Sequence, residues 1–335
     1  MDFVRSLSIF LVIVIHTSGP LIYPFGEISP ADWMTGNIYD SFARMSVPLL
    51  FMISGYLLLG KQESISAFYQ KRFQKVFIPF LFWSVLYLVW GNGYKDFTFI
   101  NAVKAIIYSI LTTPASFHMW FLYELLAIYL FVPVLRVFIL SADRVHLWYL
   151  AGIWFLFGPL QGTIEHILGF HIAINLGFFT SYFGFFVIGY LLGKMDYSAK
   201  AIGVAAIIYL LAGAYTVYAT YSISSQAGDY VDYYYWYTQI NIVIMSFSAF
   251  ILFKGVGERI TQEKVGLWFR RFAEASFGIY LIHAMVLIYL KRAGISAFSG
   301  PPLISVPAVS IFILLISWGI VAIVRRIPIL QELTP

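Results

Sequence analysis

The chain alternates between long apolar runs and short polar or Gly/Pro-rich interruptions. A helix needs about 20 apolar residues to cross the hydrocarbon of a bilayer. Runs near that length fall at about residues 6–24, 46–60, 76–92, 119–139, 147–161, 176–193, 201–221, 236–253, 273–290 and 303–324. The pattern predicts an all-α integral membrane protein with about ten transmembrane helices, forming one domain over residues 1–335 with no separate soluble domain.

The polar stretches between these runs predict where the chain leaves the bilayer. We expect the longest outer loops at about residues 20–45, 161–175 and 222–235. The stretch 97–116 contains Asn101 and Lys104, so we expect an interfacial or re-entrant helix there rather than a span. The first run lacks a small-residue cleavage site and is expected to remain as the first span.

Composition supports the membrane prediction and removes several kinds of chemistry. Of the 335 residues, 61% are hydrophobic and 11% charged, against roughly a quarter charged in an ordinary soluble domain. The absence of cysteine excludes disulfides, thiolate catalysis and thiolate metal sites. The net charge of +5 predicts no nucleic-acid partner, because basic residues in a membrane protein mark its cytoplasmic loops.

The distribution of the 21 Lys and Arg residues predicts the orientation. With the N-terminus in the cytoplasm, 16 of them fall in inner segments. The five in outer segments are Arg44, Lys95, Lys104, Lys291 and Arg292. Because positive charge accumulates on the cytoplasmic side, we expect both termini inside.

Two ionisable residues in the first run are the strongest candidates for function. Arg5 and His16 are eleven positions apart, so on a helix they share nearly one face and lie roughly 16 Å apart along the axis. A permanent cation would then stand at the cytoplasmic edge, with a titratable imidazole deeper in the bilayer. A snorkelling Arg and a helix-packing His explain the same pair equally well.

Other polar residues in or beside the runs have both functional and structural explanations. Glu124 lies within the fourth run, where a carboxylate needs a His or Arg partner on a neighbouring helix. His283 lies mid-run, and helix packing explains it best. Lys71, Arg72 and Lys75 could bind a multiply anionic ligand, but basic residues beside a span are also ordinary topology markers.

An outer segment, residues 229–237, combines carboxylates with flat aromatic side chains. Sugars stack on such rings, although an aromatic belt at the membrane surface explains the tyrosines as well. His166 and His171 are five positions apart, the wrong interval for one helical face. We therefore predict no metal site.

Several motifs resemble those of the membrane acyltransferase-3 family. Arg5 and His16 match its Arg-x10-His signature. Further matching segments, in the order and spacing of the family, are residues 46–56 (SVPLLFMISGY), Arg72 and Lys75 before Pro79, residues 118–122 (HMWFL) with Tyr129 and Pro133, and residues 276–283 (SFGIYLIH). Residues 37–60 are most similar to the enterobacterial common antigen O-acetyltransferase branch.

The resemblance implies a function for the whole chain. Members of the family move an acyl group, usually acetyl from cytoplasmic acetyl-CoA, onto sugars or lipid-linked carbohydrate at the outer face. It therefore implies a multi-pass protein of the bacterial inner membrane, surrounded by lipid, with acetyl-CoA as donor and a carbohydrate or glycolipid as acceptor. Two positions depart from the pattern: Lys75 stands where relatives often have Arg, and Glu124 falls one residue short of a frequent carboxylate.

The resulting hypothesis gives each candidate residue a role. Arg5, Lys71, Arg72 and Lys75 would hold the phosphates of CoA. His16 would act as general base or as an acyl relay, and Glu124 is a second catalytic candidate. Acceptor, oxyanion or pocket roles are expected for Arg44, Ser54, His118, Trp120 and Tyr129. A secondary transporter, or an exporter of a glycan or small solute, remains the alternative, because transporters also bury His, Glu and Arg near the midplane.

Overall fold

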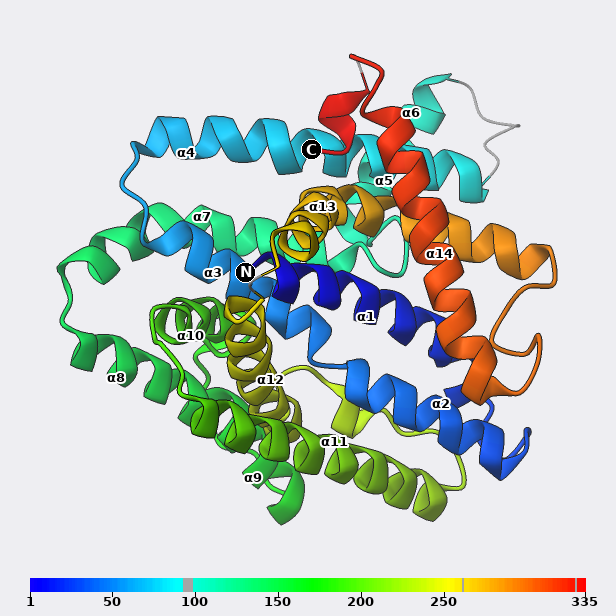
Figure 1. Ribbon diagram of the computed structural model, residues 1–335, viewed down its shortest axis with the longest axis horizontal. Coiled ribbons are helices and arrows are strands. Elements are labelled where there is room, and N and C mark those ends of the chain that lie inside the picture. Colours follow the sequence, from blue (N-terminus) through cyan, green and yellow to red (C-terminus); the bar gives the residue numbers. More distant parts are fainter. Residues whose placement is uncertain (93–98, 261, 329) are drawn as a thin grey trace.

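The computed structural model describes residues 1–92, 99–260, 262–328 and 330–335, and the described residues contain helices and no strands (Figure 1). The helices are α1 (Asp2–Ile22), α2 (Pro30–Ala43), α3 (Ser46–Leu59), α4 (Ile65–Arg72), α5 (Ile78–Asn92), α6 (Phe99–Thr112), α7 (Trp120–Ser141), α8 (Arg144–Phe155), α9 (Gln161–Leu168), α10 (Phe183–Gly193), α11 (Ala199–Ala227), α12 (Ile240–Glu258), α13 (Glu263–Arg292) and α14 (Pro302–Val324). Short π-helices at Phe73–Phe77 and Leu156–Leu160 join α4 to α5 and α8 to α9. Three 3₁₀ turns lie at Gly177–Thr180, Tyr233–Tyr235 and Gln331–Leu333.

Helix α1 lies near the middle of the bundle (Figure 1). It packs against α2, α3, α12, α13 and α14. The hydroxyl of Ser6 donates a hydrogen bond to the Phe269 carbonyl of α13 at 3.1 Å. The two polar residues of α1 singled out above, Arg5 and His16, are therefore surrounded by other helices.

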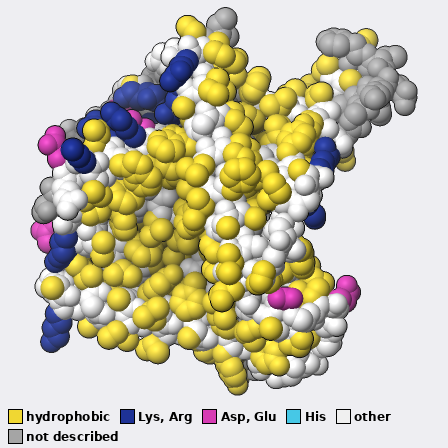
Figure 2. All heavy atoms as spheres, turned by 45° about the vertical axis from the view of Figure 1, so that its right-hand side comes forward, with side chains coloured by type: hydrophobic (Ala, Val, Ile, Leu, Met, Phe, Trp, Pro, Cys, Tyr) yellow, Lys and Arg dark blue, Asp and Glu magenta, His cyan; other side chains and the backbone are white. Residues whose placement is uncertain are grey.

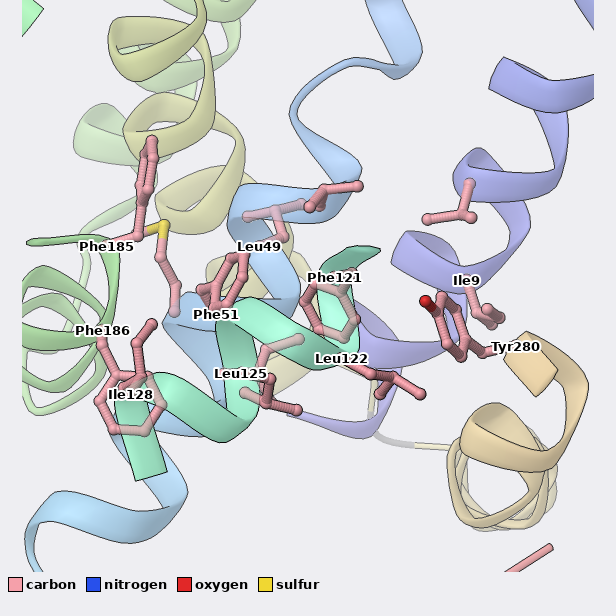
Figure 3. Packing of buried hydrophobic residues seen from close by; sticks show 14 of the residues in the cluster. Ile9, Leu49, Phe51, Phe121, Leu122, Leu125, Ile128, Phe185, Phe186 and Tyr280 are labelled. Atoms are coloured by element: carbon pink, nitrogen blue, oxygen red, sulfur yellow. The ribbon is translucent and has the colours of Figure 1, made fainter. Parts of the chain in front are cut away.

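Helices α3 and α10 approach each other very closely because glycines stand at their crossing. A Cβ on Gly55 would lie 1.8 Å from the Phe186 carbonyl oxygen, and one on Gly189 would lie 2.1 Å from the Met52 carbonyl oxygen. Small residues permit this kind of contact between membrane helices. Beside the crossing, Phe51 and Phe186 belong to one packed apolar cluster with side chains of α7 such as Leu125 (Figure 3).

The outside of the molecule is broadly apolar, as expected for a protein surrounded by lipid. Figure 2 shows hydrophobic side chains over most of one face, with Lys and Arg side chains gathered along one side of it. Among the described residues, eight helical segments are long and apolar enough to cross a membrane. The prediction of an all-α integral membrane protein is confirmed.

The predicted number of spans differs from these eight segments. Two predicted spans correspond to helices that are too short by themselves. Residues 147–161 form most of α8 and a π-helix that contains Pro159, and residues 176–193 contain only the 11 residues of α10 as α-helix. The predicted helix at 97–116 is present as α6, and its interfacial position stays a prediction.

The predicted outer loop at 20–45 is wrong. Residues Pro30–Leu59 form one long helical segment, of which α2 is the first half. Ser29 caps α2 by accepting a hydrogen bond from the Asp32 amide, and Pro30 occupies the first helical position. Three polar residues that made this stretch resemble a loop, Asn37, Asp40 and Ser41, are fully buried.

The other two predicted loops are partly helical. Residues 161–168 form α9, and α11 continues to Ala227, where Gly228 ends it with a φ of +70°. Lys95, one of the five cations expected outside, lies outside the described residues. The orientation with both termini in the cytoplasm stays a prediction.

Candidate active site

Two cavities of similar size lie along α1. The first, called the Arg5 cavity, has a volume of about 560 Å³ and contains Arg5 in its wall. The second, called the His16 cavity, has a volume of about 600 Å³ and contains His16. One helix thus supplies the cation to one cavity and the imidazole to the other.

The Arg5 cavity is lined by four cationic residues from three parts of the chain. They are Arg5 of α1, Arg72 and Lys75 of the α4–α5 region, and Arg325 after α14. Among the described residues, Arg5, Arg72 and Lys75 form no ion pair, whereas Arg325 donates hydrogen bonds to the carbonyls of Thr334 and Glu274, both at 2.8 Å. Burial lowers the pKa of Arg325, which lies beyond the end of α14.

The local fold of the α4–α5 region brings Arg72 and Lys75 to this cavity. Ser64 caps α4 by accepting from the Ala67 amide at 3.2 Å. A π-helical turn follows over Phe73–Phe77, and such turns change which residues face a given side. The guanidinium of Arg72 lies 5.5 Å from the Phe68 ring centre and 5.8 Å from that of Tyr129.

Lys71 is next in sequence but does not line the cavity. Its amino group contacts Glu63 at 2.7 Å, and Arg136 contacts the other oxygen of that carboxylate at 2.8 Å. Arg136 also donates to the Leu58 carbonyl at 2.8 Å, so this network fastens the α3–α4 connection to α7. The hydrogen bond from Lys71, together with that from Arg136, lowers the pKa of Glu63 to about 2.

The His16 cavity is lined mainly by aromatic side chains. Trp120 stacks on Tyr237 with ring centres 5.5 Å apart, and Tyr182 lies 5.4 Å from Trp120. Further aromatic residues in the wall are Tyr23, Phe117, Tyr230, Tyr235 and Trp236. Flat rings around a cavity of this size fit the ring of a sugar. Burial raises the pKa of Tyr230, which lies between the spans.

A buried ion pair forms one wall of the same cavity. Asp40 and Arg44 are one turn apart on α2 and the carboxylate accepts a hydrogen bond from the guanidinium. Arg44 lies over the Tyr235 ring at 4.3 Å, and Tyr235 donates to Asn37 Oδ1 at 2.5 Å. Arg44 was expected in the pocket, whereas Asp40 was not, although an acid and a base at an i, i+4 spacing are a signal for a helix.

Three histidines from three helical regions meet at the inner end of the His16 cavity. The His16 ring stacks on His283 at 5.4 Å, and His118 meets His283 edge-on at 4.9 Å. His118 and His283 are buried, whereas His16 is partly open to the cavity. His283 was expected only to pack, so its contact with His16 is a finding of the structure. No group of His, Asp and Glu among the described residues could hold a metal ion.

A thin layer of side chains separates the two cavities. Tyr280 and Phe121 line the Arg5 cavity, with ring centres 5.5 Å apart. The Tyr280 hydroxyl donates to the His118 carbonyl at 2.5 Å, and its ring lies 5.9 Å from His283. Tyr280 thus contacts His283, which in turn contacts His16, so these three side chains link the linings of the two cavities.

The remaining predicted residues are divided between these places. Trp120 and Arg44 line the His16 cavity, and their acceptor, oxyanion or pocket roles stay predictions. Ser54 and Tyr129 instead line the Arg5 cavity, where the hydroxyl of Ser54 donates to the Leu50 carbonyl at 2.8 Å. Glu124 is half-buried and is not among the residues that line either cavity.

Comparison with known proteins identifies the family of the chain. The profile of the acyltransferase domain family Acyl_transf_3 matches residues 1–322. The chain belongs to this family. The chain is also 28% identical over 165 residues to the succinoglycan biosynthesis protein ExoH of Rhizobium meliloti (strain 1021).

This second match is partial. It covers 44% of this chain and 44% of ExoH. No solved structure matches the chain significantly. Membership of the family therefore rests on the profile, which covers α1 to α13, all but the last two residues of α14 and every lining residue of the His16 cavity, whereas Arg325 and Pro335 of the Arg5 cavity lie beyond it.

Proposed function

We propose that this acyltransferase is a membrane-embedded O-acetyltransferase. It moves an acetyl group from cytoplasmic acetyl-CoA to a hydroxyl of a cell-envelope carbohydrate or lipid-linked glycan. The observation that carries the proposal is the pair of cavities: a cationic one and an aromatic one, separated by Tyr280, His283 and His16.

The Arg5 cavity is the proposed donor site. Phosphates bind where several Lys or Arg side chains converge, and Arg forms paired hydrogen bonds with them. Arg5, Arg72 and Lys75 line the cavity and have no carboxylate partner within ion-pair distance among the described residues. Lys71 is left out of the donor site because Glu63 already neutralises it.

The thioester then has to reach His16. Phe121 and Tyr280 stand between the cavities, so the pantetheine arm passes once these side chains have moved aside. His16 takes the proton of the acceptor hydroxyl while the oxygen of that hydroxyl attacks the thioester carbonyl. The new C–O bond forms, the C–S bond breaks, and the CoA thiolate receives the proton from the imidazolium.

An alternative route uses His16 as a covalent relay. The imidazole first attacks the thioester and carries the acetyl group, and the acceptor hydroxyl then removes it. Both routes need His16 as a group that can bind and release a proton or an acyl group. Glutamine at this position supports neither.

The acceptor would enter the His16 cavity. Its aromatic walls, including Trp120 and Tyr237, suit a sugar ring. ExoH is named for succinoglycan biosynthesis, which supports a glycan as acceptor. Within the family, the enterobacterial common antigen O-acetyltransferase branch is our choice, on the resemblance over residues 37–60.

The proposal requires the Arg5 cavity to face the cytoplasm. In that orientation both termini lie inside and the His16 cavity opens to the outer side of the bacterial inner membrane. Ser225 lies near the end of α11 and is exposed. Because the chain has no cysteine, Ser225→Cys gives a single reporter, which a membrane-impermeant thiol reagent should label from outside in intact cells.

The function is tested with purified protein in liposomes of bacterial phospholipid. Radiolabelled acetyl-CoA is supplied with a mixture of cell-envelope glycolipids, and acetyl-labelled glycolipid is the expected product. A protein that neither hydrolyses acetyl-CoA nor transfers acetyl, but moves a solute across the bilayer, would support the transporter alternative. Labelling of Ser225→Cys only from the cytoplasm would overturn the orientation.

A further inference from the structure

Asp40 has one carboxylate oxygen bound and the other unused. Its side chain is 0% exposed and lines the His16 cavity. Oδ1 accepts from Arg44, whereas Oδ2 has no hydrogen-bond partner among the described residues. The nearby Ser18 hydroxyl is engaged elsewhere, since it donates to the Val14 carbonyl at 2.8 Å.

An unpaired carboxylate oxygen in such a place is unusual. Buried polar atoms are nearly always hydrogen-bonded, and leaving one without a partner costs free energy. Arg44 cannot easily turn to serve both oxygens, because its guanidinium lies over the Tyr235 ring and Tyr235 is fixed by its hydrogen bond to Asn37. Oδ2 is therefore an unpaired acceptor on a residue that lines the cavity, with less than 1 Å² of its own surface accessible, so a ligand reaches it after a small local shift of the wall.

We propose that Asp40 is the acceptor-binding residue that selects which hydroxyl of the sugar reacts. Its free Oδ2 accepts a hydrogen bond from one hydroxyl of a pyranose, and this places a different hydroxyl of the same ring at His16. The proposal rests on the proposed function. It goes further by assigning a residue that controls orientation and by restricting the substrate class.

The charges of the cavity restrict that class to uncharged sugars. Among the described residues that line it, Arg44 is the only Lys or Arg and is paired with Asp40, and a second carboxylate, that of Asp232, also lines it. A sugar carboxylate or phosphate would find no unpaired cation there and would face the charge of Asp40. An uncharged pyranose with at least two free hydroxyls satisfies Oδ2 without adding a buried charge.

The experiment removes the carboxylate and the sugar hydroxyl separately and together. Methyl glucoside, galactoside and mannoside are tested as soluble acceptors, and calorimetry in detergent measures their binding. For the glycoside that binds best, each monodeoxy analogue is then assayed for acetyl transfer with the parent and with Asp40→Asn. NMR gives the position of the acetyl group in each product.

We expect removal of one sugar hydroxyl and removal of the Asp40 carboxylate each to weaken acceptor binding, and the two effects not to be additive. In the parent, one deoxy analogue that keeps the reacting hydroxyl should show an acceptor KM or dissociation constant raised roughly 10- to 100-fold. Asp40→Asn should raise the KM or dissociation constant of the full sugar by a similar factor. In this variant, the same deoxy analogue should bind almost as well as the full sugar. The acetyl group should appear on more than one position, while the dissociation constant for acetyl-CoA stays unchanged.

Two further variants keep the test decisive. Asp32→Asn makes the same change two turns earlier on α2, away from the cavity lining, and should leave both constants unchanged. Asp40→Glu keeps the ion pair with Arg44 if the amide variant fails to fold, and its longer side chain should change the acetylated position.

The proposal would be overturned if the deoxy substitution and Asp40→Asn weakened acceptor binding additively. It would also be overturned if both Asp40 variants acetylated the same position as the parent. A parent that binds none of the three uncharged glycosides would overturn it as well. Glycoside binding that depends on Asp40 in a protein without acetyl transfer would uphold the sugar site and contradict the proposed function alone.

Discussion

The two cavities have nearly the same volume, about 560 and 600 Å³, but opposite chemistry. In the Arg5 cavity, Arg5, Arg72 and Lys75 are without ion-pair partners among the described residues. In the His16 cavity, Arg44 forms an ion pair with Asp40 and lies over an aromatic ring. Unpaired positive charge is available to a ligand on one side only.

This difference shows how one bundle can serve two unlike substrates. A multiply anionic ligand gains from several unpaired cations, whereas a sugar gains from flat rings and fixed hydrogen-bond acceptors. His16 belongs to the aromatic cavity but is backed by His283, which contacts Tyr280 at the edge of the cationic one. Substitutions on the two sides should therefore affect different substrates, and substitutions between them should affect the reaction itself.

The largest effect is expected at His16. His16→Gln keeps hydrogen bonding but cannot take the proton or carry the acetyl group, so transfer should fall by roughly 10² or more. Binding of acetyl-CoA, measured by calorimetry in detergent, should remain. Transfer at the parent rate in this variant would keep the family and remove His16 from catalysis.

A smaller and more selective effect is expected at Arg72. Arg72→Ala should weaken acetyl-CoA binding about tenfold or more, and added salt should weaken binding to the parent as well. Arg72→Lys should be milder if charge alone matters and as damaging if paired hydrogen bonds matter.

Lys71→Ala provides the matched control for Arg72, because it removes the adjacent cation outside the cavity. It should leave the dissociation constant for acetyl-CoA almost unchanged. If Lys71→Ala and Arg72→Ala weakened acetyl-CoA binding equally, lining the Arg5 cavity would make no difference to donor binding. The donor site would then have to be placed elsewhere.

Trp120 tests the other side of the comparison. Trp120→Leu removes a ring that stacks on Tyr237 and should raise the acceptor KM about fivefold, because aromatic stacking is worth about 1 kcal/mol. Trp120→Phe keeps a flat face and should be milder. A loss of acetyl-CoA affinity in Trp120→Leu would contradict the separation of the two cavities.

The sequence predicts the features that depend on residue type alone, such as the apolar spans and the ionisable residues within them. Arg5 and His16 stand out because ionisable groups are costly in lipid, and their spacing on one helix separates them along its axis. The long apolar runs likewise predict most spans. Two predicted spans, residues 147–161 and 176–193, differ from this pattern. The first contains a π-helix with Pro159, and the second contains only the 11 residues of α10 as α-helix.

The parts that the sequence misses depend on contacts between distant segments. Asn37 and Asp40 resemble loop residues in sequence, but each finds partners inside the bundle, such as Tyr235, which is 198 positions from Asn37. The contact of His283 with His16 joins α13 to α1 and has no local signal. Lys71 and Arg72 are adjacent and similar, yet they lie about 100° apart around α4, so Lys71 binds Glu63 whereas Arg72 lines the Arg5 cavity.

The smallest effect, on stability alone, is expected at Glu63. Its carboxylate binds Lys71 and Arg136 and its side chain is 11% exposed, so Glu63→Gln should lower the free energy of unfolding by roughly 1–3 kcal/mol near neutral pH. Because these hydrogen bonds lower its pKa to about 2, the carboxylate stabilises the fold above its ordinary pKa of 4.5. That contribution is lost as the pH falls from about 4.5 towards 2, so the difference between parent and variant should shrink over this range. Thermal unfolding in detergent measures it, with Glu274→Gln, which breaks an exposed pair with Arg270, as a control of small effect. A difference that stays constant down to pH 2 would show that Glu63 acts through packing rather than charge, and the network that separates Lys71 from the donor site would need another explanation.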